Sequence, residues 1–310
     1  MNELPQQLVN GLLLGSMYGL VAIGYTMVYG IVQLINFAHG EIFMMGAFGA
    51  LAVHLWVLPE DTSMWVALPL MLIGAILVAS LVAVGAERFA YRPLRGGPRL
   101  APLITAIGLS LALQQAVWAW FPEAKSARPF PQIEGGPFHI GSVTIQTGDI
   151  FLLCAAPISM AVLGYFVMKT RTGRGMQATA QDPDTAKLMG INTNRIIVVA
   201  FALGALFAAV GGVANGLKYG EIKYTMGFIL GLKAFTAAVL GGIGNIYGAM
   251  IGGLVLGVAE TLATAYIADV PGMDQFGSQS WASVWAFVLL ILVLLLRPQG
   301  LLGERVADRA

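Results

Sequence analysis

Charged side chains are scarce in this sequence of 310 residues. Asp, Glu, Lys and Arg together make up 11% of the chain and hydrophobic residues make up 57%, whereas soluble domains usually contain about 25% charged residues. A soluble fold of this length needs more polar surface to face water, so the composition predicts a chain surrounded largely by lipid. The net charge of +1 provides no basic field to attract nucleic acid, and no nucleic-acid partner is expected.

Cysteine and histidine are also rare. The one cysteine, Cys154, lies in an apolar run, cannot form an intrachain disulfide and is interpreted as a small packing residue. The three histidines form no His-Glu-x-x-His pair, so no metal site and no enzyme active site are predicted. The pattern Gly-x4-Gly-Lys-Ser/Thr is missing too. ATP and Mg²⁺ must therefore bind other polypeptides if they drive this protein, and no cofactor is expected on this chain.

The N-terminal part of the chain contains no Lys or Arg before Arg88. A secretory signal peptide begins with a positive segment and ends at a cleavage site of small residues. Neither feature accompanies the apolar run that begins at Leu8. This run is therefore expected to remain as a membrane span.

Long apolar runs are what the sequence does contain. A helix needs about 20 mostly apolar residues to cross a bilayer, and backbone groups in lipid must pair internally, so helix is the expected state. The pattern predicts one all-α transmembrane domain over residues 1–310, a polytopic bundle of eight to nine membrane helices. Segments near Asn36 and Gly244 are expected to be broken or re-entrant. The candidate spans are Leu8–Gly30, Ile42–Leu58, Met64–Ala86, Leu100–Phe121, Ile150–Met168, Ile196–Leu217, Met226–Gly241, Asn245–Ile267 and Trp281–Leu296.

Lys and Arg gather in alternate loops, which sets the expected orientation. The loops 87–99 and 169–195 and the C-terminal tail are expected in the cytoplasm, whereas the Pro- and Gly-rich loop 122–148 is expected on the outer side. Nine crossings place the N-terminus outside and the C-terminus in the cytoplasm. The basic residues are Arg88, Arg92, Arg95 and Arg99 in the first loop, Lys169, Arg171, Arg174, Lys187 and Arg195 in the second, and Arg297, Arg305 and Arg309 in the tail.

The loop 169–195 contains the pattern of a short capped helix. Asp182 is a good N-cap, Pro183 suits the first helical position, and Gly190 is a natural terminator after the helix. The helix between them would carry apolar residues into a water-facing loop. Such a short helix is marginal alone, so one interpretation is a partner protein that covers its apolar side. The other is an amphipathic connector that lies on the lipid interface.

This loop resembles a motif of a known family. Residues 184–190 are similar to the cytoplasmic loop motif of ATP-binding-cassette importer permeases, Glu-Ala-Ala, three residues and Gly, although Asp and Thr replace the Glu and the first Ala here. Longer stretches resemble the H-type permeases of high-affinity branched-chain amino acid importers. These stretches are residues 23–30, 35–41, 87–93, 188–193, 233–244 and 248–253, and the likeness covers nearly the whole chain except the loop 121–149.

The resemblance implies a transport subunit of the bacterial inner membrane. It implies assembly with a second homologous permease, two ATPase subunits and a periplasmic binding protein that delivers the small-molecule solute. In this family the cytoplasmic loop forms a coupling helix that docks on an ATPase subunit. On that basis the residues expected to couple to the ATPase are Arg174, Asp182, Asp184, Thr185, Ala186, Leu188, Met189 and Gly190.

Ionisable and polar residues at membrane depth are the candidates for the solute path, because they are costly in lipid. Broken helices offer free backbone groups that can bind a zwitterion. For Lys233 and Glu260 the alternatives are that they pair with polar groups between packed helices or that they extend toward the membrane interface. The path candidates are Asn36, His39, Gly40, Glu41, Lys233, Gly244, Asn245 and Glu260.

Two alternatives remain open for function. Sister permeases of the same kind carry urea, short amides or other amino acids, and nothing in the sequence picks out side chains that would select leucine, isoleucine or valine. The interrupted helices and Glu260 also fit an ion-coupled secondary transporter, which would work without an ATPase.

Overall fold

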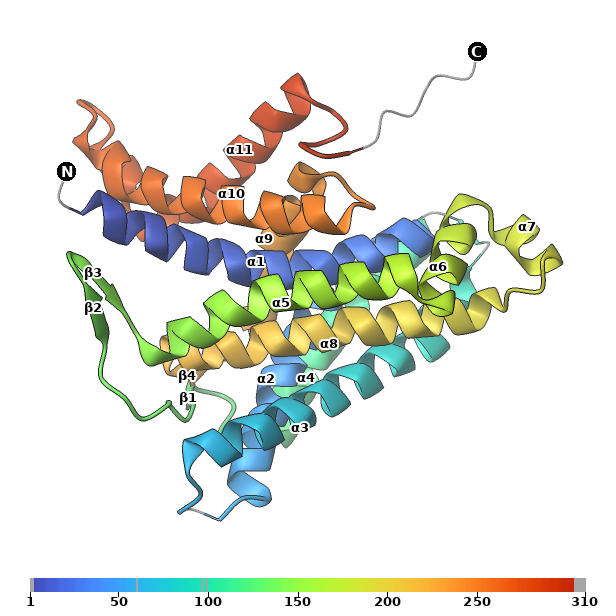
Figure 1. Cartoon of the computed structure of the whole chain (residues 1–310), viewed down its shortest axis with the longest axis horizontal. Helices are drawn as coiled ribbons and strands as arrows, with labels where there is room; N and C mark the ends of the chain where they lie inside the picture. Colours follow the sequence, from blue (N-terminus) through green and yellow to red (C-terminus); the bar gives the residue numbers. More distant parts are fainter. Residues whose placement is uncertain (1–2, 60, 96, 99, 304–310) are drawn as a thin grey trace.

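The computed structural model describes residues 3–59, 61–95, 97–98 and 100–303, and within them the chain folds almost entirely into helices (Figure 1). Arg99, Arg305 and Arg309 lie outside the described residues. The helices are α1 Leu4–Val32, α2 His39–Trp56, α3 Met64–Gly85, α4 Leu100–Trp120, α5 Thr147–Lys169, α6 Arg171–Gln181, α7 Pro183–Leu188, α8 Thr193–Tyr219, α9 Met226–Gly241, α10 Ile246–Tyr266 and α11 Ala282–Leu296.

The predicted class, an all-α polytopic membrane protein, is confirmed. Six helical segments among the described residues are long and apolar enough to cross a membrane. Two further apolar helices, α9 and α11, are shorter, and α2 contains 18 residues. The exact number of crossings, eight or nine, therefore stays a prediction. The six long segments are Leu4–Val32, Met64–Leu94, Leu100–Trp120, Thr147–Lys169, Thr193–Tyr219 and Ile246–Asp269.

The two ends of the bundle differ. Helices α6 and α7 project from one end, and a hairpin of strands β2 (Phe138–Ile140) and β3 (Val143–Ile145) lies at the opposite end with the start of α1 (Figure 1). Gln6 of α1 fixes this arrangement, because its side chain donates to the Thr144 carbonyl at 3.1 Å and accepts from the Thr144 N–H at 2.7 Å. A second small sheet joins β1 (Arg128–Pro129) to β4 (Glu221–Ile222).

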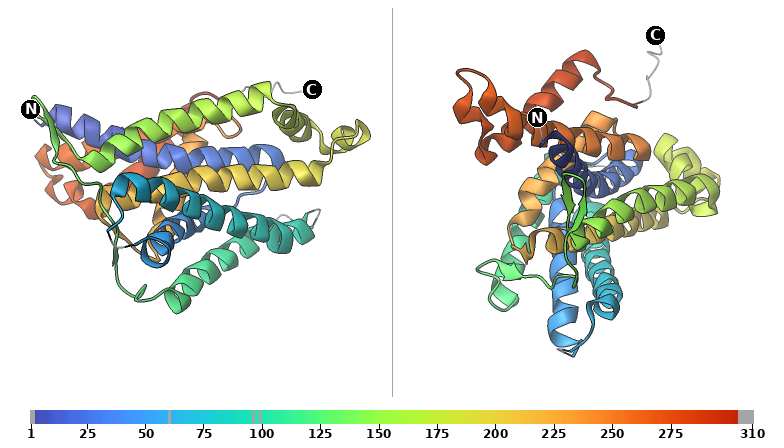
Figure 2. Two further views of the ribbon diagram at one scale, coloured as in Figure 1. Left: turned by 60° about the horizontal axis from the view of Figure 1, so that its bottom comes forward. Right: turned by 60° about the vertical axis from the view of Figure 1, so that its left-hand side comes forward.

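Helix α1 forms the centre of the bundle, packed against α10, α8 and α9 (Figure 2). Glycines allow the close approach to α10. Gly11, Gly15 and Gly19 recur every four residues on α1 and face the α10 backbone around Gly253 and Gly257. A Cβ atom added at Gly15 would lie 2.6 Å from the Leu254 Cα. Stripes of small residues of this kind let membrane helices pack backbone against backbone.

The chain turns back into the bundle after α1. Gln33 ends the helix in a left-handed conformation, with its N–H donating to the Tyr29 carbonyl at 2.8 Å. Helix α2 then begins at His39, whose ring lies against the backbone at Gly24 and Gly204. Gly24 stands eight residues before the end of α1, so α2 begins about 12 Å inside that end. The break predicted near Asn36 is therefore present as a re-entrant turn.

Two local expectations need correction. Cys154 is exposed on the outer side of α5 instead of packed inside, because the buried side chains of that helix include Leu152 and Ala156. The loop 169–195 contains a second helix, α6, before the predicted short helix. The loop 122–148 contributes the strands β1 to β3.

Candidate functional site

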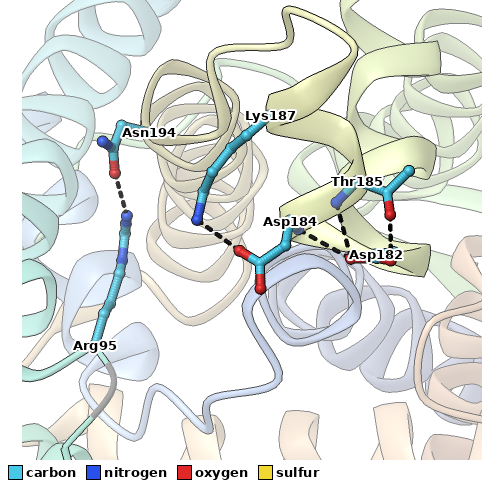
Figure 3. Close-up of polar contacts among 6 residues, drawn as sticks. All are labelled: Arg95, Asp182, Asp184, Thr185, Lys187 and Asn194. Atoms are coloured by element: carbon cyan, nitrogen blue, oxygen red, sulfur yellow. Dashed lines mark hydrogen bonds and ion pairs between the residues drawn. The ribbon is translucent and has the colours of Figure 1, made fainter.

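The start of α7 is fixed by its N-cap, as the sequence predicted. The Asp182 Oδ1 accepts from the N–H groups of Asp184 at 2.9 Å and Thr185 at 3.1 Å, and its Oδ2 accepts from the Thr185 hydroxyl at 2.5 Å (Figure 3). These hydrogen bonds, led by the one from the Thr185 hydroxyl, lower the pKa of the Asp182 carboxyl. The cap is therefore charged at neutral pH and holds the first turn of α7.

The end of α7 is fixed as well. Gly190 has φ +83°; its N–H donates to the Lys187 carbonyl, and the Ile191 N–H donates to the Ala186 carbonyl, both at 3.0 Å. This pair of bonds is a Schellman motif, which requires the left-handed residue that Gly supplies most easily. Asn192 then caps α8 by accepting from the Arg195 N–H at 3.0 Å. Helix α7 is therefore a short element with both ends defined.

The apolar residues of α7 point in different directions. Leu188 is 86% exposed and Met189 is 78% exposed, whereas Ala186 is 4% exposed. The expectation that all three face water is therefore wrong for Ala186, which packs back onto the protein because it stands on the opposite face of the helix from Leu188. The other residues expected to couple, Arg174, Asp182, Asp184, Thr185 and Gly190, are exposed. Helix α7 thus begins with exposed polar residues and ends at two exposed apolar side chains, Leu188 and Met189, which we call the tip of α7.

The first group of path candidates lies buried around the start of α2. The Glu41 Oε1 accepts from Ser110 at 3.0 Å and from Gln114 at 2.8 Å, both on α4. The Asn36 Oδ1 accepts from the Tyr91 hydroxyl at 2.5 Å. The His39 ring meets the Tyr25 ring edge to face, with centroids 4.8 Å apart.

Several polar atoms of this group have no partner. In the described part of the chain, no hydrogen bond reaches the Asn36 Nδ2, the His39 Nε2 or the Glu41 Oε2, although each residue is at most 3% exposed. Buried polar groups are normally satisfied, so such atoms need an explanation. Gly40 lies beside them against the backbone of Gly227 and Gly231 at the start of α9. The break thus combines tight backbone packing with free hydrogen-bonding capacity.

Lys233 and Glu260 lie apart from this group and form an ion pair with each other. The Lys233 Nζ is 2.6 Å from the Glu260 Oε1, and the Tyr18 hydroxyl donates to the Glu260 Oε2 at 3.0 Å. Their side chains are 10% and 3% exposed. This cluster joins α9, α10 and α1. The alternative interpretation, pairing between packed helices, therefore describes these two residues better than a position on an open path.

Gly244 and Asn245 occupy a third place, the turn between α9 and α10. The Asn245 Oδ1 accepts from the Gly248 N–H at 3.0 Å and so caps α10, and its Nδ2 donates to the Leu302 carbonyl at 3.0 Å. Both residues line a cavity of about 420 Å³ with Gln177 of α6. The path candidates are thus divided among three regions and do not form a single site.

The residues that pair with these groups cannot be recognised from the sequence. Tyr18, Ser110 and Gln114 stand in apolar runs without a motif of their own, and Tyr91 belongs to the stretch 87–93 that is similar to the permease family but does not indicate its partner. Glu87 follows an apolar run and belongs to a stretch similar to the permease family, but its pairing with Arg95 depends on the turn between α3 and α4. These residues can be recognised only in the structure, where each lies next to its partner from another part of the chain.

The chain is similar to known transport components along nearly its whole length. The family model described as "Branched-chain amino acid transport system / permease component" matches residues 7–294. The high-affinity branched-chain amino acid transport system permease protein BraD of Pseudomonas aeruginosa is 47% identical, over 96% of this chain and 95% of that protein. The corresponding permease LivH of Escherichia coli is 44% identical over the same shares.

A solved structure has a related fold. PsaBC from Streptococcus pneumoniae, in complex with a Fab, matches with a TM-score of 0.51 and 13% sequence identity, over 94% of this chain and 91% of that chain. At this identity the likeness concerns the fold alone. It shows that the arrangement of membrane helices recurs in a solved structure.

Proposed function

Since the chain belongs to the family of branched-chain amino acid transport permeases, we propose that it forms part of the membrane path of an ATP-driven importer for leucine, isoleucine and valine. The ATPase activity resides on separate subunits, because the sequence contains no nucleotide-binding loop. The assembly contains a second permease of the same family, two ATPase subunits and an external solute-binding protein. It resides in a bacterial inner membrane.

The arrangement of basic regions supports the proposed orientation. The Arg95 Nη1 donates to the Asn194 Oδ1 at 2.9 Å, which places the loops 87–99 and 169–195 together. The segment after α11 joins them, because Gly303 and Gln177 line the same cavity. These three regions are the ones rich in Lys and Arg, and such regions face the cytoplasm. The C-terminus is therefore cytoplasmic, and the β2–β3 hairpin is external.

The observation that carries the proposal is the exposed tip of α7. Helix α7 projects from the end of the bundle assigned to the cytoplasm (Figure 1). Leu188 and Met189 are exposed at the end of this helix, whose two ends are held by caps. Large apolar side chains with such exposure are suited to fill a pocket of a partner, where a few buried anchors supply most of the binding energy. We assign this tip to docking on an ATPase subunit, with Ala186 as the packing contact that holds it.

The solute path is assigned to the two breaks. Asn36, His39, Gly40 and Glu41 supply hydrogen-bonding atoms in the interior, and a zwitterion brings both an ammonium and a carboxylate to such a site. Gly244 and Asn245 line the cavity at the cytoplasmic end. Lys233 and Glu260 are assigned to packing of α1, α9 and α10.

Replacing both tip residues by Gln tests the docking role. The double variant L188Q/M189Q removes the apolar surface from two exposed side chains and leaves the caps of α7 intact. Uptake by the assembled transporter in proteoliposomes should fall about tenfold or more, since loss of a central anchor costs that much. The amount of the permease in the membrane should stay unchanged because neither side chain packs inside the chain.

A matched variant controls for the position itself. The exchange L188M/M189L keeps the apolar surface and should transport like the unaltered protein. Normal uptake by L188Q/M189Q would contradict the proposal, and equal losses in both double variants would show that the effect comes from local structure.

A further inference from the structure

A line of polar contacts leads from the start of α8, just after α7, to the break at Asn36. Its first member is Asn194, in the first turn of α8 and four residues after Gly190. The Asn194 Oδ1 accepts from the Arg95 Nη1 at 2.9 Å, across from Lys187 and Asp184 (Figure 3). Because only residues 189–192 connect α7 to α8, displacement of α7 shifts the first turn of α8, and with it the Asn194 side chain that binds the guanidinium of Arg95.

Arg95 has a second partner on the same guanidinium. Its Nη2 pairs with the Glu87 carboxylate, whose side chain is fully buried, while that of Arg95 is 19% exposed. A buried carboxylate needs such a partner because its desolvation is costly. The planar fork of Arg suits two acceptors at once, which Lys does not. Arg95 thus joins α8 to the segment that continues α3.

Glu87 stands on a π-helical turn, Ala86–Tyr91, that extends α3. Turns of this kind are rare and are found often at functional sites. Tyr91, at the other end of the same turn, is 1% exposed, and its hydroxyl donates to the Asn36 Oδ1 at 2.5 Å. Asn36 precedes α2 by three residues. One turn therefore holds both Arg95 and the re-entrant break.

A cavity lies between α7, the start of α8 and the segment that follows α3. It has a volume of about 480 Å³ and is lined by Pro183 and Lys187 of α7, by Asn194, and by Arg92 and Arg95. The Asn194–Arg95 hydrogen bond joins two walls of this cavity. The space leaves room for α7 to move, and this bond passes a displacement of the α7–α8 connection to the segment after α3.

We infer that Arg95 is a positioning residue that transmits movement of the docked α7 to the break at Asn36, through Glu87 and Tyr91. The inference rests on the proposed function, because it gives α7 a moving partner. In this scheme, movement of the ATPase shifts the start of α8, and the bond from Asn194 moves Arg95. Arg95 then moves the π-helical turn through Glu87, and Tyr91 on that turn displaces Asn36. The unpartnered atoms at Asn36, His39 and Glu41 then change their positions in the path.

Two mild variants test the line without unpairing the buried Glu87. N194A removes the bond to Arg95, and Y91F removes the bond to Asn36. In the assembled transporter in proteoliposomes, leucine uptake should fall about tenfold for N194A and about fivefold for Y91F, as expected for a charged and a neutral hydrogen bond. The ATPase rate should stay within about twofold, so that fewer molecules are transported per ATP hydrolysed.

The double variant N194A/Y91F distinguishes a line from two separate contacts. If both bonds act in series, the double variant should transport no worse than N194A; independent contacts would multiply the two losses. T179V is the control, since Thr179 lines the same cavity but its hydroxyl bonds only the Gly175 carbonyl of its own helix, at 2.7 Å. It should transport normally.

Three outcomes would overturn the inference: normal uptake in both single variants, parallel loss of uptake and ATPase activity, or loss of assembly in both. L188Q/M189Q is measured in the same series. If it blocks uptake while N194A and Y91F transport normally, the transmission line fails and docking stands. If it transports normally, the docking proposal fails.

Discussion

Replacing Gly15 by Ala should destabilise the protein by about 3 kcal/mol, although Ala normally strengthens a helix by up to about 1 kcal/mol relative to Gly. The added Cβ would lie 2.6 Å from the Leu254 Cα and 2.7 Å from the Gly253 carbonyl oxygen. These are backbone atoms that cannot rotate away, so α1 and α10 must separate. The unfolding temperature in detergent should fall by several degrees, and less protein should accumulate in the membrane.

Gly108 provides the matched control for this change. It also lies inside a long apolar helix, α4, but among the described residues no atom beyond its neighbours and the nearby backbone of α4 lies within 4 Å of a Cβ built there. G108A should therefore leave stability unchanged or raise it by about 0.5–1 kcal/mol. Equal stability of G15A and G108A would show that α1 and α10 are not in backbone contact, and the fold described above would be wrong at its centre.

Replacing Lys233 by Met should destabilise the protein by about 3–5 kcal/mol, since it leaves the Glu260 carboxylate buried without its partner. The cost is high because the pair lies at membrane depth with both side chains at most 10% exposed. Thermal unfolding in detergent and the amount of folded protein measure the loss. E260Q should also be destabilising, because it leaves the buried Lys233 ammonium without its counter-ion, although the amide can still accept the Tyr18 hydroxyl bond.

The double variant K233M/E260Q tests the role of the pair. With both charges removed, most of the stability should return, and uptake should return with it if the pair serves helix packing. A double variant that is stable but inactive would place Lys233 and Glu260 on the solute path instead. A double variant whose loss of stability equals the sum of the two single losses would show that the two side chains do not interact.

Much of the fold could be predicted from the sequence because its causes are local. Apolar runs of about 20 residues identify helices in lipid without any knowledge of their neighbours. The α7 caps follow from residue types at fixed spacings, and Asp182, Gly190 and Asn192 have the expected bonds. Glycine and polar residues near Asn36 and Gly244 likewise indicated interruptions, which the structure contains.

The remaining features depend on contacts between helices, which a single sequence does not reveal. Glu41 pairs with Ser110 and Gln114, residues 69 and 73 positions away. The sequence identifies Arg95 only as part of a basic loop. Its contacts with Glu87 and Asn194 depend on the π-helical turn that follows α3. Helix α6 is not predicted by its sequence, because it contains Gly173 and Gly175, which have low helix propensity. The burial of Ala186 likewise depends on how α7 packs against the rest of the chain.

The exposure of position 188 in the assembled transporter tests the docking of α7 most directly. The single cysteine variant L188C is made with C154A, because Cys154 is itself exposed, and its reaction with a water-soluble maleimide is followed. The thiol should react rapidly in the permease alone and about tenfold or more slowly once the ATPase subunit is bound, as expected for a buried anchor. A cysteine at Ile140, on the external hairpin, should react equally in both. An unchanged rate at position 188 would contradict the assignment of this helix as the ATPase contact.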